Sequence, residues 1–231
     1  MAIPKTPSKL TFAAKKFIMQ MLKRFQDGSN NIFTIDNLKK EVFTHSDLSS
    51  SPLIAKFIAY SNLDFKGMPM PVMVVDFYPN KSLNDVFKKV RRKKNKFSEW
   101  TDTKKFIVIY GIASAMKLLH SKNIIHRDLN PHSILLDDSL NPKLTNFSLS
   151  LLIQQEDFIT LDKIVGYDPY IAPEIWISKK YSKKSDVYAF GILINEILTN
   201  KSPFGKFNSS QFYQKVCIEK ERPKKDETVP V

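Results

Sequence analysis

The stretch HRDLNPHSILL, residues 126–136, decides the fold because it joins a charged segment directly to an apolar one. Its first half carries His126, Arg127 and Asp128, and its second half ends in three consecutive apolar residues. A polar turn and a second short apolar run follow. Short apolar runs on either side of such a turn are typical of a hairpin. We therefore predict two short strands around a polar turn over residues 133–147.

Length and composition bound the class of protein. The chain has 231 residues, 42% of them hydrophobic, which is enough for one full core or for one large and one small lobe. Its one cysteine, Cys217, excludes an internal disulfide framework and is expected to be a buried apolar side chain in a reducing compartment. No secretory signal opens the chain, and no run reaches the ~18 apolar residues of a membrane span. We expect a cytoplasmic location, with the nucleus as the alternative.

The net charge of +13 is partly concentrated in KKVRRKKNK, residues 88–96, where only Val90 and Asn95 are uncharged. Most runs of this kind are the solvated end of a helix or a loop. The functional alternative is a patch that binds nucleic acid, anionic lipid or an acidic partner. The run contains no aromatic residue on which a base could stack, which disfavours single-stranded nucleic acid.

Periodicity predicts a small, strand-rich first part. Its apolar and β-branched segments predict a strand at 8–19 and a pair of strands at 52–62 and 70–78. Residues 34–48 read as a helix that starts at Thr34 or Asp36, with Leu38, Val42 and Phe43 on its apolar face.

The second part is predicted to be larger and mostly helical. A turn and a short helix are expected at 78–90, and a long helix at 102–123 whose apolar stripe contains Phe106, Tyr110, Ala113 and Leu118. Residues 185–200 read as a helix that opens on a Ser185–Asp186 cap. Because that helix is apolar nearly all round, it is expected to be buried.

Several stretches, in this order along the chain, carry a family resemblance. They are VMVVDFYPNKSL at 72–83, HRDLNPHSILL, KLTNFSLS at 143–150, VGYDPYIAPE at 165–174 and KSDVYAFGILINEILT at 184–199. Together they resemble the hinge, the catalytic loop, the two ends of the activation segment and the large-lobe helix of eukaryotic protein kinases. The closest style is the tyrosine-kinase-like serine/threonine group.

The resemblance implies an α+β, protein-kinase-like two-lobe fold. Residues 1–78 would form an incomplete small lobe, and residues 79–231 a helical large lobe without the family's final helices. Asp186 would be the buried aspartate that hydrogen-bonds to the backbone of the catalytic loop. Glu174 would lack the late arginine with which the family pairs it, since Arg222 comes too early. Tyr167 stands where the family has a threonine.

The resemblance also assigns a catalytic role and shows what has been replaced. Asp128 would be the proton acceptor for the substrate hydroxyl. Asn146 and Ser133 occupy the two positions that normally bind Mg²⁺, and Asn130 replaces the lysine that steadies the transferred phosphate. Mg²⁺ prefers carboxylate oxygens in a strict octahedral site. We therefore expect no metal ligand in the chain.

The nucleotide parts are also incomplete. The family's glycine-rich loop has no counterpart, since the two closest glycines, Gly191 and Gly205, are 14 residues apart. The resemblance implies Lys15 and Glu41 as the pair that orients the phosphates. It implies the hinge around Asp76 and Tyr78 as the adenine contact. ATP and Mg²⁺ are expected to bind weakly or not at all.

Three functions are consistent with these residues. The first is a catalytically impaired pseudokinase that acts by binding or scaffolding a signalling protein. The second is a weakly active, ATP-dependent serine/threonine kinase. The third is a basic module that binds nucleic acid or anionic surfaces through 88–96. A general base contributes ~10²–10⁴ in rate and each lost electrostatic contact removes ~10²–10³, so the combined losses favour the first.

Overall fold

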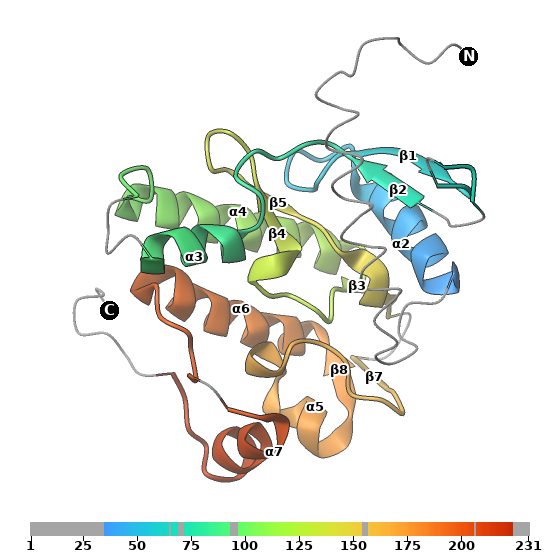
Figure 1. The fold of residues 1–231 in the computed structure, drawn as a ribbon. Coiled ribbons are helices and arrows are strands. Elements are labelled where there is room, and N and C mark those ends of the chain that lie inside the picture. Colours follow the sequence, from blue (N-terminus) through green and yellow to red (C-terminus); the bar gives the residue numbers. More distant parts are fainter. Residues whose placement is uncertain are drawn as a thin grey trace.

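The computed structural model describes residues 35–64, 66–68, 72–92, 97–153, 157–205 and 207–223. The strand predicted at 8–19, with Lys15 in it, lies outside these residues. Figure 1 shows two groups of elements: β1, β2 and α2 together at one side, and a larger helical group built around α4 and α6.

The small group contains the predicted helix and the predicted pair of strands. Helix α2 (Ile35–Leu48) precedes β1 (Phe57–Ser61) and β2 (Val72–Val75), which pair antiparallel. Phe43, however, is 75% exposed, so its assignment to the buried face was wrong. The buried positions of the described part of α2 follow another stripe of one helical face: Leu38, Glu41, His45 and Leu48.

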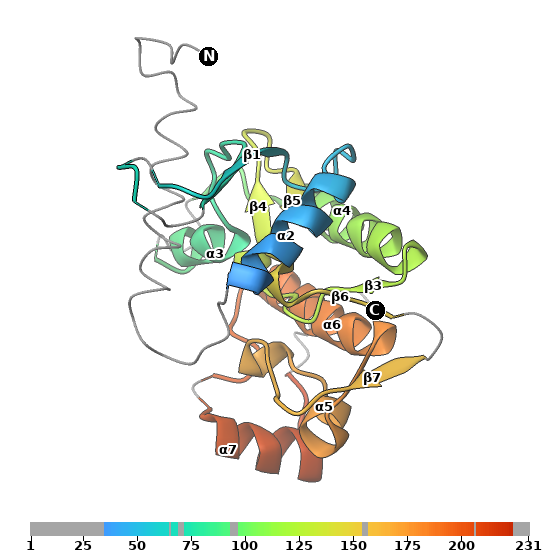
Figure 2. The same ribbon diagram turned by 90° about the vertical axis from the view of Figure 1, so that its right-hand side faces the viewer.

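The large group is helical with short strand pairs between the helices (Figure 2). Its helices are α3 (Leu83–Arg92), α4 (Asp102–Ser121), α5 (Pro173–Ser178), α6 (Lys183–Thr199) and α7 (Ser209–Phe212). A π-helical turn, Tyr213–Ile218, follows α7. Three 3-10 turns are Pro131–Ser133, Phe147–Leu149 and Asp168–Tyr170.

All strand pairs described in this group are antiparallel. They are β3 (Ile124–Ile125) with β6 (Leu151–Leu152), β4 (Ile134–Leu136) with β5 (Pro142–Leu144), and β7 (Phe158–Thr160) with β8 (Lys180–Ser182). The β4–β5 pair confirms the hairpin predicted at 133–147. Its apolar side chains Ile134, Leu136 and Leu144 are buried in the main core. The segment before this hairpin, which contains Asp128, is therefore attached to a rigid support.

The long helices bury other faces than the sequence suggested. On α4 the buried stripe is Val108, Ile112, Ala115, Met116 and Leu119. Phe106 and Tyr110 are 56% and 76% exposed, so the predicted stripe was wrong at both positions. On α6 the N-cap is Ser182, in a capping box with Ser185, and the predicted Ser185–Asp186 cap was wrong by three residues.

Helix α6 is also less buried than its composition suggests. Asp186 is buried in its first turn, but Val187 is 55% exposed.

Within the described residues, no helix has both the length and the apolar character required to cross a membrane.

Candidate active site

Asp186 of α6 holds the backbone of the loop that contains Asp128. Its carboxylate is 4% exposed and accepts the N–H groups of His126, at 2.8 Å, and Arg127, at 2.9 Å. His120 of α4 lies 3.0 Å from the same carboxylate. These bonds hold Arg127 in the left-handed region, with φ 67°, which is unusual for a residue with a Cβ. The predicted anchoring role of Asp186 is confirmed.

His126 and Arg127 then fasten the loop to its neighbours. The His126 ring donates from Nε2 to the carbonyl of Thr145, at 3.0 Å, and accepts the Asp128 N–H at Nδ1, at 3.2 Å. Arg127 donates from Nη1 to the carbonyl of Leu149, at 2.9 Å, and its guanidinium lies 4.4 Å above the Tyr181 ring. Burial lowers the pKa of Arg127, yet the group stays charged at any ordinary pH.

Both oxygens of the Asp128 carboxylate accept hydrogen bonds from asparagine side chains. Asn130 Nδ2 donates to Oδ1 at 2.7 Å, and Asn146 Nδ2 donates to Oδ2 at 2.8 Å. A carboxylate oxygen can accept more than one hydrogen bond, so these two amides do not by themselves exclude a substrate hydroxyl. The amides nevertheless fix the carboxylate and supply no positive charge beside it. A transferred phosphate would find a dipole where the family has a lysine.

The side chains at the two positions that would bind a metal, Ser133 and Asn146, hydrogen-bond to neighbouring protein groups and lie close to each other. Ser133 donates its hydroxyl to the carbonyl of Asp128, at 2.6 Å, and lies 3.4 Å from Asn146 Nδ2. The side-chain oxygen of Asn146 accepts a bond from the Ser148 hydroxyl, at 3.2 Å. In the described part of the chain, no group of three or more His, Cys, Asp or Glu side chains could hold a metal ion. Neither position carries the carboxylate that Mg²⁺ prefers, so Asn146 and Ser133 do not fit Mg²⁺ as the family's ligands do.

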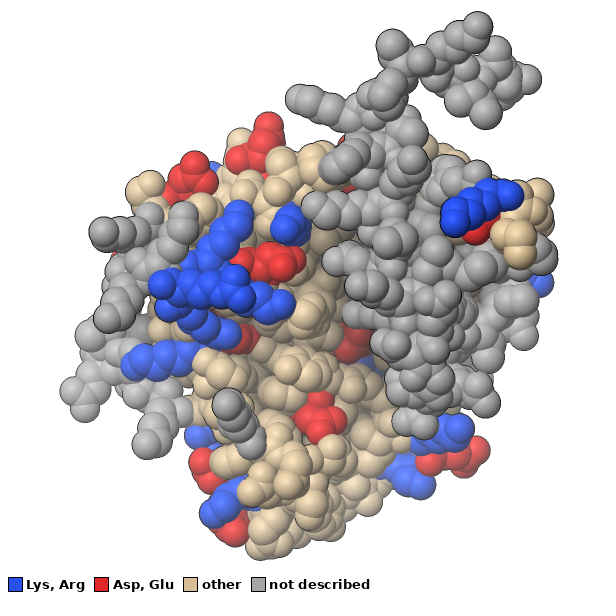
Figure 3. All heavy atoms as spheres, in the orientation of Figure 1, with Lys and Arg blue, Asp and Glu red and all other residues tan. Residues whose placement is uncertain are grey.

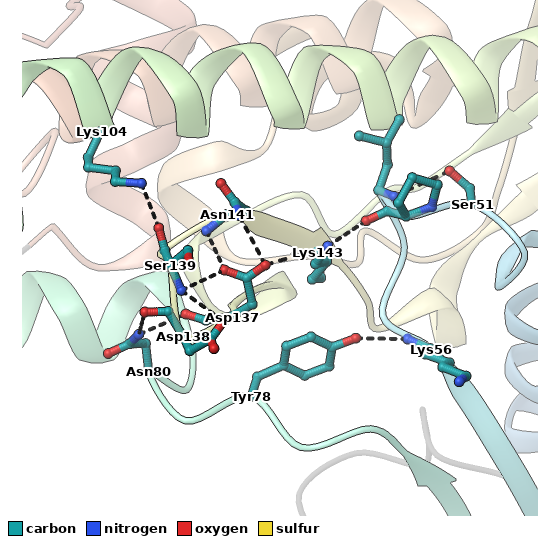
Figure 4. Close-up of polar contacts among 12 residues, drawn as sticks. Ser51, Lys56, Tyr78, Asn80, Lys104, Asp137, Asp138, Ser139, Asn141 and Lys143 are labelled. Atoms are coloured by element: carbon teal, nitrogen blue, oxygen red, sulfur yellow. Dashed lines mark hydrogen bonds and ion pairs between the residues drawn. The ribbon is translucent and has the colours of Figure 1, made fainter.

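The hinge residues lie at a different surface. Asp76 and Tyr78 line a cleft of about 700 Å³ with the turn between β4 and β5 (Figure 4). The Tyr78 hydroxyl accepts the N–H of Lys56 at 2.9 Å, and burial raises the pKa of Tyr78. Opposite Tyr78, Lys143 donates to the carbonyl of Pro52 at 2.7 Å. The cleft does not include Asp128 or Asn146.

Part of the hinge backbone is suited to adenine. The Asp76 N–H donates to Lys56, and the Tyr78 carbonyl accepts from Lys81. Among the bonds of the described residues, the Asp76 carbonyl and the Tyr78 N–H have no partner, and these are one acceptor and one donor. Glu41 is buried on α2, while Lys15 lies outside the described residues. Their pairing therefore stays a prediction.

One residue of this region was missed by sequence reasoning. His45 is fully buried on the same face of α2 as Glu41, four residues further on. Its ring meets Phe147 edge-on with centroids 5.2 Å apart, and its Nε2 bonds to the carbonyl of Ala55. Among the described residues its Nδ1 has no hydrogen-bond partner, and burial lowers the pKa of His45 to about 4. In the sequence, the only sign of this was that His45 follows Glu41 by four residues, which places both on one face of the helix.

The protein kinase domain family matches the chain over residues 5–230. Cysteine-rich receptor-like protein kinase 25 of Arabidopsis thaliana is 37% identical over 198 residues, which are 84% of this chain and 27% of that protein. Cysteine-rich receptor-like protein kinase 10 of Arabidopsis thaliana is 40% identical over 149 residues, 62% of this chain and 20% of that protein. Lectin-domain containing receptor kinase VI.3 is 34% identical over 135 residues, 57% of this chain and 19% of that protein, also in Arabidopsis thaliana.

The chain therefore belongs to the protein kinase domain family and has its α+β fold. It spans about a fifth to a quarter of the length of these relatives. Members of this family use ATP and Mg²⁺ in general. Asn130, Ser133 and Asn146 stand at positions where the family's ATP- and Mg²⁺-using members carry other residues.

Proposed function

We propose that this protein is a catalytically impaired protein kinase homologue that acts by binding a signalling protein in the cytoplasm. The observation that carries the proposal is the Asp128 carboxylate, which accepts an asparagine N–H at each oxygen. Phosphoryl transfer depends on positioning and on neutralising the phosphate charge. Neutral amides replace the groups that would do this, and the side chains at the metal positions bond to one another.

The experiment is a phosphotransfer assay with radiolabelled ATP. Purified protein is incubated with Mg²⁺ or Mn²⁺, alone and with generic protein substrates, beside Asp128→Asn as a matched variant. We expect no incorporation above background in either protein. Incorporation by the wild type that disappears in Asp128→Asn would instead establish the weakly active serine/threonine kinase, since Asp128 is in place and its loop is well anchored.

A second candidate function rests on the basic surface of α3. Lys and Arg side chains gather over this helix (Figure 3), where Lys88, Arg91 and Arg92 are exposed. Arg91 is partly neutralised, because it pairs with Glu196 at 2.6 Å. Lys88 and Arg92 are the better candidates for contact with an acidic protein, nucleic acid or an anionic surface.

The salt dependence of binding tests whether the basic surface of α3 is the binding site. Binding of a nucleic acid or an acidic protein through α3 should weaken steeply with salt. It should weaken further in Lys88→Glu/Arg92→Glu. Affinity that is unchanged by both salt and substitution would remove α3 from consideration.

A further inference from the structure

The cleft of about 700 Å³ beside Tyr78 is separate from the site around Asp128 (Figure 4). Ligand-binding clefts of proteins measure roughly 300–1,000 Å³, so this one has the size of a ligand site. Its walls come from three stretches that are far apart in sequence, which lie within residues 49–56, 76–79 and 137–143. They are the connection between α2 and β1, the hinge after β2, and the turn between β4 and β5. A ligand here would contact both groups of elements.

Hydrogen bonds connect these three walls. Lys143 of the third wall donates from Nζ to the carbonyl of Pro52 in the first, at 2.7 Å. The Tyr78 hydroxyl of the second wall accepts the N–H of Lys56 in the first, at 2.9 Å. Asn80, just after the second wall, donates from Nδ2 to a carbonyl of the hairpin turn at 2.7 Å. Each wall is therefore bonded to the other two, and a site that is formed before its ligand arrives loses less conformational entropy on binding.

The volume of the cleft favours an extended ligand over a helical one. A helix with a diameter of about 10 Å fills about 400 Å³ in each turn of about 5.4 Å, so fewer than two turns fit in about 700 Å³. A helix of that length is not stable in water. An extended segment needs no minimum length, so a few of its residues can fill the same space.

The apolar part of the lining is suited to proline. It consists of Phe77, which is 43% exposed, the half-buried Tyr78 and two exposed prolines, Pro52 and Pro79. Aromatic-lined clefts bind proline-containing segments, because such segments are extended before they bind. A polyproline II segment has no internal hydrogen bonds, so its carbonyl groups need donors. The Tyr78 hydroxyl accepts the N–H of Lys56, and no described residue accepts its own proton, so it can donate to the ligand.

The charges of the lining are balanced except at one end. Lys143 Nζ lies 3.7 Å from a carboxylate oxygen of Asp137. The Asp76 N–H donates to the Lys56 carbonyl at 2.9 Å, so this lysine also lies next to an aspartate. Asp138 is the remaining carboxylate of the lining; it is exposed, lies at the hairpin-turn end in Figure 4, and forms no ion pair with a described residue. The cleft therefore favours a ligand with a basic group at that end.

We propose that this cleft binds an extended, proline-containing segment of a partner protein, with a basic side chain of that segment beside Asp138. The prolines of the segment pack on the aromatic and proline side chains of the walls, and the Tyr78 hydroxyl donates to one of its carbonyl groups. This inference rests on the binding role proposed above and gives that role a site.

The test measures the binding of three labelled peptides to the full chain by fluorescence anisotropy, without nucleotide. Each has about ten residues, which span about 30 Å as polyproline II. The first has an arginine at each end and prolines at every third position between them. The second has glutamates in place of the arginines, and the third has alanines in place of the prolines. We expect the first to bind about fivefold more tightly than the second, as one exposed ion pair allows, and about tenfold more tightly than the third, whose chain must be ordered on binding.

Charge reversal makes the test specific. Attraction to the whole chain, with its net charge of +13, would favour the glutamate peptide, so a preference for arginine has to arise locally. Asp138→Lys should invert that preference. Asp162→Lys, the same change at an exposed position outside the cleft, should leave it as it is. Phe77→Ser should weaken binding of the arginine peptide about tenfold, because it removes an exposed ring from the lining.

Three results with the peptides would overturn the proposal: tighter binding of the glutamate peptide, equal binding of the proline and alanine peptides, or equal effects of Asp138→Lys and Asp162→Lys. A concentration-dependent dimer in sedimentation that disappears in Phe77→Ser would also overturn it, by assigning the cleft to a second copy. The outcome is independent of the phosphotransfer assay. Phosphotransfer would contradict the impaired site and leave the cleft in place, whereas failure of the peptides would remove the cleft and leave the impaired site in place.

Discussion

Hydrogen bonds to two aspartates, Asp186 and Asp128, hold the loop around residues 126–128 in place. Asp186 accepts two backbone N–H groups, and Asp128 accepts two amide groups. The first pair keeps the loop in the family's arrangement. The second pair comes from Asn130 and Asn146, which stand where the family has a lysine and a metal-binding aspartate. A loop can thus keep the family's shape while three of its polar positions carry other residues.

Asp186→Ala should lower the free energy of unfolding by about 3 kcal/mol, because it leaves buried loop donors without an acceptor. The measurement is denaturant unfolding beside Asp138→Ala. Asp138 lies in the exposed hairpin turn and accepts one backbone N–H, so that substitution should cost about 1 kcal/mol or less. Equal effects at both sites would contradict the anchoring role of Asp186.

His45 should make stability depend on pH in the acid range. The pKa of His45 is about 4 in the folded chain, against about 6.5 for an ordinary histidine in the unfolded chain, because burial disfavours the charged ring. The unfolded chain therefore binds the proton first. Stability should be full above pH 6.5 and fall by about 3 kcal/mol as the pH drops to 4.

The check is the pH dependence of unfolding in His45→Gln, whose amide can still donate to Ala55 but does not titrate. That variant should show a flatter curve between pH 6.5 and 4 than the wild type, with His132→Gln as a control. A slope that persists in His45→Gln would assign the acid sensitivity to other groups.

Asn146→Asp should reintroduce a conflict that the asparagine avoids. A second carboxylate would stand where Asn146 Nδ2 now lies 2.8 Å from Asp128 Oδ2, and like charges at this distance repel. We expect a lower melting temperature without metal and a partial recovery in millimolar Mg²⁺. The wild type should be indifferent to Mg²⁺. An Mg²⁺-dependent rise of several degrees in the wild type would argue against the impaired site.

Helices α4 and α6 each contain one glycine in their middle, and the two glycines have different surroundings. Gly111 of α4 faces the β4–β5 hairpin, where an added Cβ would lie 2.4 Å from Pro142 Cγ. Gly191 of α6 faces open space. The first glycine permits close packing of a helix against a strand. The second is required by no contact inside the described chain.

Gly111→Ala and Gly191→Ala should therefore have opposite signs. Alanine favours a helix over glycine by about 1 kcal/mol at either position. At Gly191 that gain should appear as increased stability. At Gly111 the clash with a proline ring should outweigh it and destabilise the protein by about 1–3 kcal/mol. Thermal unfolding of both variants decides this, and stabilisation by both would mean that the hairpin can move aside.

For the whole molecule, the losses at the nucleotide site predict a weak response to ATP. The hinge offers the Asp76 carbonyl and the Tyr78 N–H, but the phosphates lack a metal ligand at Asn146 and Ser133. We expect any shift in melting temperature with millimolar ATP to be small and unchanged by adding Mg²⁺, since ligand-induced stabilisation follows binding by mass action. A shift that requires Mg²⁺ would contradict this.

The sequence by itself determined the family, the strand pair, the β4–β5 hairpin and the role of Asp186. The strand pair and the hairpin follow from local patterns such as short apolar runs and turn residues. The family and the role of Asp186 follow from the resemblance that the quoted motifs carry. Helix existence was predictable for the same reason, because period and length are local properties. The replacements at Asn130, Ser133 and Asn146 could also be read directly.

Only the tertiary structure decided which faces are buried and where the polar side chains point. Phe43, Phe106 and Tyr110 are apolar at helical spacing, yet they are exposed because no described element packs against their sides of α2 and α4. Likewise, the bond from Asn146 to Asp128 joins residues 18 positions apart. Burial and hydrogen-bond partners depend on elements that are distant in sequence, and a local pattern carries no information about them.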